Sequence, residues 1–228
     1  MELQSQKQYW DRVASEKQFH HPLRLAWLDS HVAGRDLLDC GCGYGRLLAE
    51  LTQRGYHNTV GTDFSEGMLR RCNMLHPDLD LRLVQTDGKT LPFRDHSFDG
   101  VLLFTVLTCM PMESEQRGLF AEVQRILRPN GLVYISDLLL NTDSRNVLRY
   151  KQFVEQFGSY GVFRLPEGVV VRHHDEEWIR SLTAAFDRLE YERFNVTTMN
   201  GNPSAAFQYL GRLRRALPVC RTGSTPAY

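Results

Sequence analysis

The chain has 228 residues, 42% of them hydrophobic, and its 27 Lys and Arg residues balance its 27 Asp and Glu residues. This length and composition suit one α/β domain with a sizeable core. A formal net charge of zero lacks the basic excess with which nucleic-acid-binding proteins neutralise phosphates, so we expect no nucleic-acid partner.

The cysteines and the apolar runs of the sequence indicate the cellular compartment of the protein. The five cysteines are an odd number, scattered along the chain, and the segment 1–10 is polar, unlike a secretory signal. The longest apolar run, 101–112, is interrupted by polar residues and is shorter than a bilayer requires. We therefore expect a cytoplasmic protein with reduced thiols and no membrane partner. A monomer and a homodimer both stay open.

Helical and strand patterns alternate along the chain. Amphipathic segments predict helices at 4–17, 22–33, 45–54, 65–75, 113–127 and 175–185. Apolar and β-branched runs predict strands at 36–40, 58–62, 80–85, 98–103, 132–136, 188–195 and 205–211. The alternation predicts an α/β fold, with a Rossmann-like, mainly parallel seven-stranded sheet and helices on both faces. A turn at 200–203 predicts that the last two strands form an antiparallel pair.

The most informative stretch is 37–45, Leu-Leu-Asp-Cys-Gly-Cys-Gly-Tyr-Gly, between a predicted strand and a predicted helix. Glycine tolerates positive φ and lets a ligand approach the backbone closely. The helix that follows presents its free N–H groups to the loop. This pattern predicts a cofactor cradle. The loop is Gly-x-Gly-x-Gly because position 46 is arginine, so the fingerprint typical of NAD-binding proteins is broken at its third glycine.

Several motifs in the right order resemble those of the class I S-adenosylmethionine-dependent methyltransferases, of the small-molecule methyltransferase-domain type. They are the segments 9–11, 37–45, 60–65, 85–88, 91–93, 97–99 and 126–131. The resemblance implies S-adenosyl-L-methionine as cofactor and S-adenosyl-L-homocysteine as product. It places the cofactor on Tyr9, Trp10, Asp39, Gly41, Cys42, Gly43, Gly45, Asp63, Phe64, Met68, Asp87, Gly88 and Phe104.

Three carboxylates carry most of this expectation. Asp63 ends the second strand and can accept both ribose hydroxyls, while the alternative, a helix cap, can be supplied by Ser65. Asp87 can accept from the adenine amine, or it can serve as a turn residue before a glycine. For Asp39 two interpretations stay open: it organises the loop, or it faces the amino group of the methionine part of the cofactor.

The aromatic and sulfur side chains have structural alternatives. Tyr9 and Trp10 resemble residues that approach the sulfonium by cation–π attraction, although Trp10 can equally anchor a helix to the core. Phe64 is better placed against the adenine. Cys40 and Cys42, one residue apart with no second pair, have poor zinc spacing, so we expect no metal site.

Residues 138–174 do not fit the alternation, and they begin at the sheet edge where ligands bind in open α/β folds. We expect a helix and a glycine-punctuated lid over the acceptor pocket. The alternative is that the aromatic stripe at 150–157 only packs the insert onto the sheet. Tyr160 and Phe163 lie off that stripe and are predicted to bind substrate.

The resemblance also places groups after the fourth strand near the transferred methyl, so Thr105 and Leu107 are predicted to bind substrate. His173 and His174 follow the expected lid, and an imidazole suits general-base work near neutral pH. The alternative is that both histidines are surface residues at the start of a helix.

We expect one methyltransferase domain. Its parts are N-terminal helices (1–33), a cofactor-binding core (34–137), a substrate-lid insert (138–174), a C-terminal helix with a strand pair (175–212) and a tail (213–228).

The expected reaction is methyl transfer to an N, O or S atom of a small-molecule acceptor. Alternatives are a tRNA or protein methyltransferase working with a partner, a dinucleotide-dependent oxidoreductase and a non-catalytic binding module.

Overall fold

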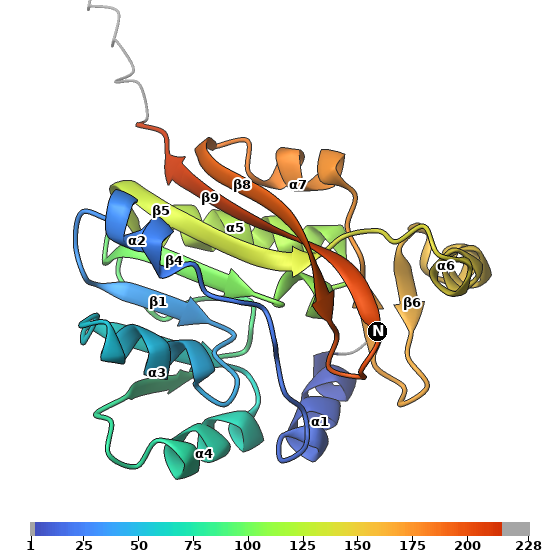
Figure 1. Cartoon of the computed structure of the whole chain (residues 1–228), viewed down its shortest axis with the longest axis horizontal. Helices are drawn as coiled ribbons and strands as arrows, with labels where there is room; N and C mark the ends of the chain where they lie inside the picture. The colour runs from blue at the N-terminus through green and yellow to red at the C-terminus, as the bar shows by residue number, and fades with distance from the viewer. Residues whose placement is uncertain (1–2, 216–228) are drawn as a thin grey trace, which may run out of the picture.

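The computed structural model describes residues 3–215 and contains a seven-stranded sheet with the strand order β3-β2-β1-β4-β5-β9-β8 (Figure 1). The strands are β1 (Leu37–Cys40), β2 (Thr59–Asp63), β3 (Arg82–Gln85), β4 (Phe98–Phe104), β5 (Leu127–Leu138), β8 (Phe186–Thr197) and β9 (Pro203–Leu213). The pairs among β1 to β5 are parallel, and β9 pairs antiparallel with both β5 and β8. The predicted fold class is confirmed. The part of the predicted tail beyond residue 215 lies outside the described residues.

The helices are α1 (Leu3–Val13), α2 (Leu25–His31), α3 (Arg46–Gln53), α4 (Glu66–Leu75), α5 (Glu113–Ile126), α6 (Ser144–Phe157) and α7 (Glu176–Leu182). A short 3-10 turn, η1 (Leu107–Cys109), follows β4. The first two helices are shorter than predicted: α1 ends at Val13, and α2 begins at Leu25. Arg24, which precedes α2, has a φ of −87° and a ψ of 82°, outside helical geometry, so the helix begins after it. Within residues 3–215, no helix combines the length and hydrophobicity that crossing a bilayer demands.

Adjacent residues of the central strands pack into different cores on the two sheet faces. Leu38 and Leu103 join the cluster that includes α5 and α7, whereas Leu37 and Leu102 join the cluster that includes α2 and α3. Side chains along a strand alternate between faces, so a strand covered on both sides must be apolar throughout. These continuous apolar runs are the reason that the parallel strands could be predicted.

The insert after β5 forms α6 and an antiparallel pair, β6 (Val162–Arg164) and β7 (Val170–Arg172). In Figure 1, α6 and β6 lie to the right, beyond the end of β5. A third apolar cluster joins the insert to α1, with Tyr150 and Phe163 from the insert beside Trp10. The insert is also tied to η1, where the Thr108 hydroxyl donates to the Arg172 carbonyl at 2.7 Å. It therefore packs over the carboxyl end of the sheet.

Two glycines of the insert share a positive φ but differ in how closely other atoms pack around them. Gly161 has a φ of 95°, and a Cβ there would overlap the carbonyl oxygen of His173; Gly168 has a φ of 97° with open space around it. We expect Gly161→Ala to lower the free energy of unfolding by about 3 kcal/mol, and Gly168→Ala by about 1–2 kcal/mol, because only the first adds overlap to backbone strain. Urea unfolding followed by circular dichroism measures both losses. Equal losses would contradict the described packing.

Candidate active site

A cavity of about 420 Å³ lies at the carboxyl ends of β1, β2 and β4. It is lined by most of the residues predicted to bind the cofactor: Trp10, Asp39, Gly41, Cys42, Gly43, Asp63, Phe64, Met68, Gly88 and Phe104. Parallel strands end at the same edge of the sheet, so motifs far apart in the sequence meet there.

The glycine loop after β1 has the backbone shape that only glycine adopts without strain. Gly41, Gly43 and Gly45 have φ values of 78°, 54° and 81°. The N–H of Gly43 donates to Oδ2 of Asp63 at 2.9 Å, and the N–H of Ser65 donates to Oδ1 at 2.8 Å. Asp63 therefore holds the loop to the end of β2. Each oxygen keeps a second lone pair for a hydroxyl donor.

The helix that follows Asp63 is capped by the residue predicted to cap it. The Met68 N–H donates to the Ser65 hydroxyl oxygen at 3.1 Å. Asp63 is thereby left to the loop and the cavity, although burial raises its pKa to about 6.

Asp39 is an unsatisfied charged group in the wall of the cavity. Its side chain is 1% exposed, and neither carboxylate oxygen has a hydrogen-bond partner in the described part of the chain. Burial raises its pKa to about 7, against a smaller lowering by Arg46. A buried carboxylate without partners is costly unless a ligand supplies donors. Because these oxygens bond to no loop atom, the geometry favours the interpretation in which Asp39 receives an ammonium group.

Arg46 occupies the position of the missing third glycine and connects two parts of the site. Its Nη2 donates to the carbonyl oxygen of His21 at 2.6 Å, and its Nη1 pairs with Glu50 at 2.8 Å. This side chain fixes the segment between α1 and α2 against the start of α3. It also lines the cavity. Its side chain takes up the space in which the third glycine of a dinucleotide-binding loop would let the helix pack closely on the strand.

A second, smaller cavity of about 90 Å³ lies under the insert. The two cavities share five lining residues: Trp10, Phe19, His21, Thr105 and Cys109. The insert contributes Arg149, Phe163 and His173 to the second cavity. The cofactor cradle therefore adjoins a second space that is large enough for part of a small molecule. A bound cofactor and a second ligand would meet at the shared residues.

His173 faces this second cavity as a hydrogen-bond donor. The Asn141 side-chain oxygen accepts from the Ala205 N–H at 2.8 Å, which turns its NH2 group, a donor only, toward Nδ1 of His173 at 3.2 Å. The Tyr150 hydroxyl oxygen lies 2.6 Å from the same Nδ1. With Nδ1 as an acceptor, the proton of the neutral ring sits on Nε2.

The surroundings of His173 do not favour the predicted role as a general base, and that role stays a prediction. Burial lowers its pKa to about 3, so the ring stays neutral and takes up a proton poorly near neutral pH. Its Nδ1 lone pair is already occupied. The residue reaches the predicted place, but with the opposite hydrogen-bonding role.

A match to the family model described as "Methyltransferase domain" covers residues 38–135, which include the glycine loop, Asp63, the strands β2 to β4 and most of β1 and β5. The chain is an S-adenosylmethionine-dependent methyltransferase. Its cofactor is S-adenosyl-L-methionine, and the site fits it: the buried carboxylates of Asp39 and Asp63 line the cavity where they would accept hydrogen bonds from its amino and hydroxyl groups. The strand order of the sheet agrees with this family assignment.

Relatives of this methyltransferase are found by sequence and by structure. A ubiquinone biosynthesis O-methyltransferase of Acinetobacter baylyi is 26% identical over 89% of this chain and 84% of its own. A phthiotriol/phenolphthiotriol dimycocerosates methyltransferase of Mycobacterium tuberculosis is 34% identical over 49% of this chain and 41% of its own. A SAM-dependent methyltransferase structure from Methanosarcina mazei superposes with a TM-score of 0.77 at 22% identity, over 86% of this chain and 99% of that chain.

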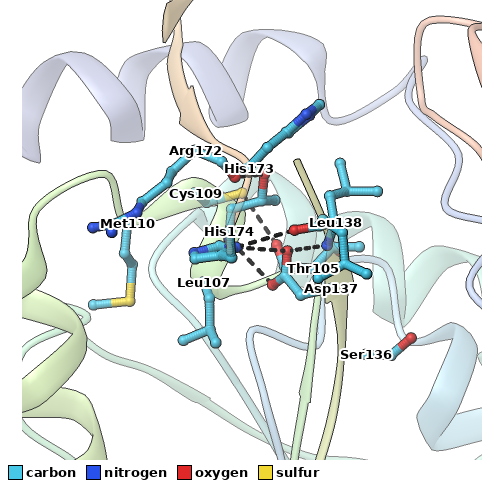
Figure 2. Close-up of polar contacts among 12 residues, drawn as sticks. Thr105, Leu107, Cys109, Met110, Ser136, Asp137, Leu138, Arg172, His173 and His174 are labelled. Atoms are coloured by element: carbon cyan, nitrogen blue, oxygen red, sulfur yellow. Dashed lines mark hydrogen bonds and ion pairs between the residues drawn. The ribbon is translucent and has the colours of Figure 1, made fainter. Parts of the chain in front are cut away.

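His174 lines neither cavity, which corrects its predicted catalytic role. Its ring is fully buried, 3.0 Å from the Gln116 amide and 3.2 Å from the Leu138 carbonyl oxygen. Figure 2 shows it directed at Asp137 and Leu138. Neighbouring residues of an extended segment point to opposite sides, so only one of two adjacent histidines can face the cavity.

Leu107 and Tyr160, which were predicted to bind substrate, line neither cavity, and these predictions are also corrected. Leu107 is fully buried in the core beside α5, where its apolar side chain belongs. Tyr160 is 43% exposed and packs edge-on against Tyr150, with 5.1 Å between ring centroids. Thr105 and Phe163, by contrast, line the second cavity as predicted substrate-binding residues should.

Three predicted cofactor residues support the cavity without lining it. Asp87 is exposed and accepts from the N–H groups of Lys89 and Thr90 at 2.9 and 3.0 Å, which is the alternative turn role. Tyr9 is buried with its ring edge-on to Trp10, 5.1 Å between centroids. Gly45 caps α3, and a Cβ there would overlap Cys72.

Sequence reasoning missed His21, which lines both cavities. Its Nδ1 lies 2.8 Å from the Ser136 hydroxyl oxygen, and burial lowers its pKa to about 3. The only local signal is the proline that follows it, which ends helical geometry and marks a loop. That signal says nothing about which cavity the ring faces.

The pKa of Asp39 predicts how cofactor binding depends on pH. An ammonium group binds the ionised carboxylate, so protonation below pH 7 competes with the ligand. We expect the affinity for S-adenosyl-L-homocysteine to be about tenfold weaker at pH 6 than at pH 7.5. Asp39→Asn should weaken binding at pH 7.5 by about tenfold, through loss of a charge-assisted hydrogen bond, and flatten this pH dependence. Isothermal titration calorimetry measures both. An unchanged pH slope in Asp39→Asn would contradict the assignment.

Proposed function

We propose that this methyltransferase transfers the methyl group to a nitrogen, oxygen or sulfur atom of a small organic molecule, and that residues 138–174 act as its substrate lid. The observation that carries the proposal is the small second cavity, which has a volume of about 90 Å³ under the insert and shares lining residues with the cofactor cradle. A recess of this size suits a small molecule, whereas a tRNA or a folded protein needs an extended binding surface. The proposal therefore favours a small acceptor over the macromolecular alternative.

Among the three acceptor atoms, we favour a hydroxyl oxygen. The support is the relative that is similar over most of both chains, which is named as an O-methyltransferase of ubiquinone biosynthesis. The lining of the second cavity agrees in character, since aromatic and aliphatic side chains such as Phe163 and Leu165 alternate with neutral polar groups such as Ser204. A phenolic acceptor presents a flat apolar body and a small polar edge of this kind.

The acceptor and the cofactor would meet at the residues common to both cavities. Thr105 stands there with a φ of 58°, which is rare for a β-branched residue. Its N–H donates to the Ser136 carbonyl at 2.8 Å, and its hydroxyl donates to the Phe104 carbonyl at 2.7 Å. These bonds hold the strained backbone and point to a functional reason for it.

These residues contribute by orienting the two reactants and by excluding water. S-adenosyl-L-methionine supplies an electrophilic methyl on a sulfonium, and no covalent enzyme intermediate is needed. Holding two reactants in attack geometry can supply about 7–11 kcal/mol. Trp10 and Phe19 form the shared apolar wall, with 6.0 Å between their ring centroids. An aromatic wall favours a cationic centre by about 0.5–2 kcal/mol.

The direct test of the proposed function is transfer of a tritiated methyl group from S-adenosyl-L-methionine. We expect label to enter simple catechols, such as 3,4-dihydroxybenzoate, or the small-molecule fraction of a cell extract. Asp63→Asn is the control, because it removes the loop-to-strand contact and should abolish transfer. Label found only in protein or tRNA, with normal cofactor binding, would overturn the small-molecule proposal.

The neutral histidines predict the shape of the pH profile. Because burial holds the pKa of both His21 and His173 at about 3, kcat at saturating substrates should show no inflection near pH 6.5 that depends on either histidine. His173→Gln keeps a donor and should retain kcat within about threefold, whereas His173→Ala should lose about tenfold, the value of one hydrogen bond. An imidazole inflection near pH 6.5 that disappears in His173→Gln would contradict this prediction.

A further inference from the structure

The second cavity has basic but no acidic side chains among the described residues of its wall. Among the described residues that line it, none is Asp or Glu, while Arg145 and Arg149 both come from α6 and lie one turn apart. Arg145 has a distant contact with Asp143, at 3.9 Å. Within residues 3–215, no ion pair joins the Arg149 guanidinium to a carboxylate. The cavity therefore contains a positive charge that the described residues do not neutralise.

Arg149 is also half-buried and held in place. Its guanidinium carbon lies 4.4 Å from the centroid of the Phe163 ring, so the planar group stacks on an aromatic face. Phe163 is itself fixed, because its ring packs edge-on against His173 with 5.0 Å between centroids. Burial and the charge of Arg145 lower the pKa of Arg149 from its usual value. A stacked guanidinium keeps its N–H edge free to meet a planar oxyanion.

Resting on the proposed function, we infer that the acceptor is an organic acid whose carboxylate pairs with Arg149 while its nucleophilic atom reaches the shared wall at Thr105. A half-buried cation without a carboxylate partner is costly, and a ligand anion removes that cost. His173, whose ring packs edge-on against Phe163, also lines this cavity and offers a second, neutral donor. The sulfonium of the cofactor adds one more positive charge near the acceptor, which an acid balances.

Carboxylate is favoured over phosphate because the recess is small and because only one of the two arginines is partly buried. Arg145 is exposed, whereas a phosphate dianion is usually held by several charged donors. The body of the acid lies against the apolar residues Phe163 and Leu165. This arrangement describes an aromatic or aliphatic hydroxy acid.

The test is carried out on the full chain saturated with S-adenosyl-L-homocysteine, so that the cofactor site is filled in every sample. Two matched pairs of probes are titrated by calorimetry: 3,4-dihydroxybenzoate with 3,4-dihydroxybenzamide, and 3-(4-hydroxyphenyl)propanoate with its amide. Each pair differs only in charge. We expect at least one acid to bind about tenfold more tightly than its amide, as one charge-assisted hydrogen bond pair requires.

Variants locate the preference. Arg149→Met should bring acid and amide within about twofold of each other, and Arg149→Lys should keep part of the preference because it keeps the charge. Arg164→Met is the matched control: this arginine of β6 is exposed and donates to the Gly168 carbonyl at 2.9 Å, and the preference should be unchanged. The heat of S-adenosyl-L-homocysteine binding confirms that each variant keeps its cofactor site.

Four results would overturn the inference: equal binding of acids and amides, a preference that persists in Arg149→Met, failure of both acids to bind, or tighter binding of phenyl phosphate than of benzoate. The proposed function fails separately, through absence of methyl transfer to any small molecule. An acid that binds at Arg149 without being methylated thus supports the carboxylate site and counts against the reaction.

Discussion

The hydrogen bond from the Gly43 N–H to the Asp63 carboxylate is the contact on which the site depends. It joins the loop after β1 to the end of β2, and the other oxygen of Asp63 accepts from Ser65 at the start of α4. One buried side chain thus sets the relative position of a loop, a strand end and a helix. A loop residue with a Cβ would resist the φ of 54° that brings this N–H into range.

A second constraint is the shared packing of the N-terminal segment and the insert. Trp10 of α1 lies in the same apolar cluster as Tyr150 and Phe163, although these residues are far apart in the sequence. Arg46 then holds the segment that follows α1 by donating to the His21 carbonyl. The two cavities adjoin each other because these elements meet over the carboxyl end of the sheet. Water exclusion at their junction is a consequence of this packing.

The two cavities differ in charge, and this difference organises the chemistry. Asp39 and Asp63 line the larger one, where they would receive the ammonium group and the ribose hydroxyls of the cofactor. Arg149 lines the smaller one, whose described wall contains no acid. A buried charge without a partner is costly, and a bound ligand of the opposite charge removes that cost. The cofactor and an acidic acceptor each supply what their own cavity lacks, without an imidazole base between them.

The sequence by itself determined the parallel sheet, the glycine loop and the position of Asp63 at the end of β2, because apolar strand runs, positive-φ glycines and an acid at a strand end are local patterns. It could not separate His173 from His174: the two differ only in the side of an extended segment, which packing against η1 and α5 decides. It also could not place His21 or Arg149, since a histidine in a loop and an arginine on a helix are ordinary surface residues until distant elements enclose them. Only the tertiary structure decided these roles, because burial and partners that are far apart in the chain set both the hydrogen-bonding role and the pKa of a side chain.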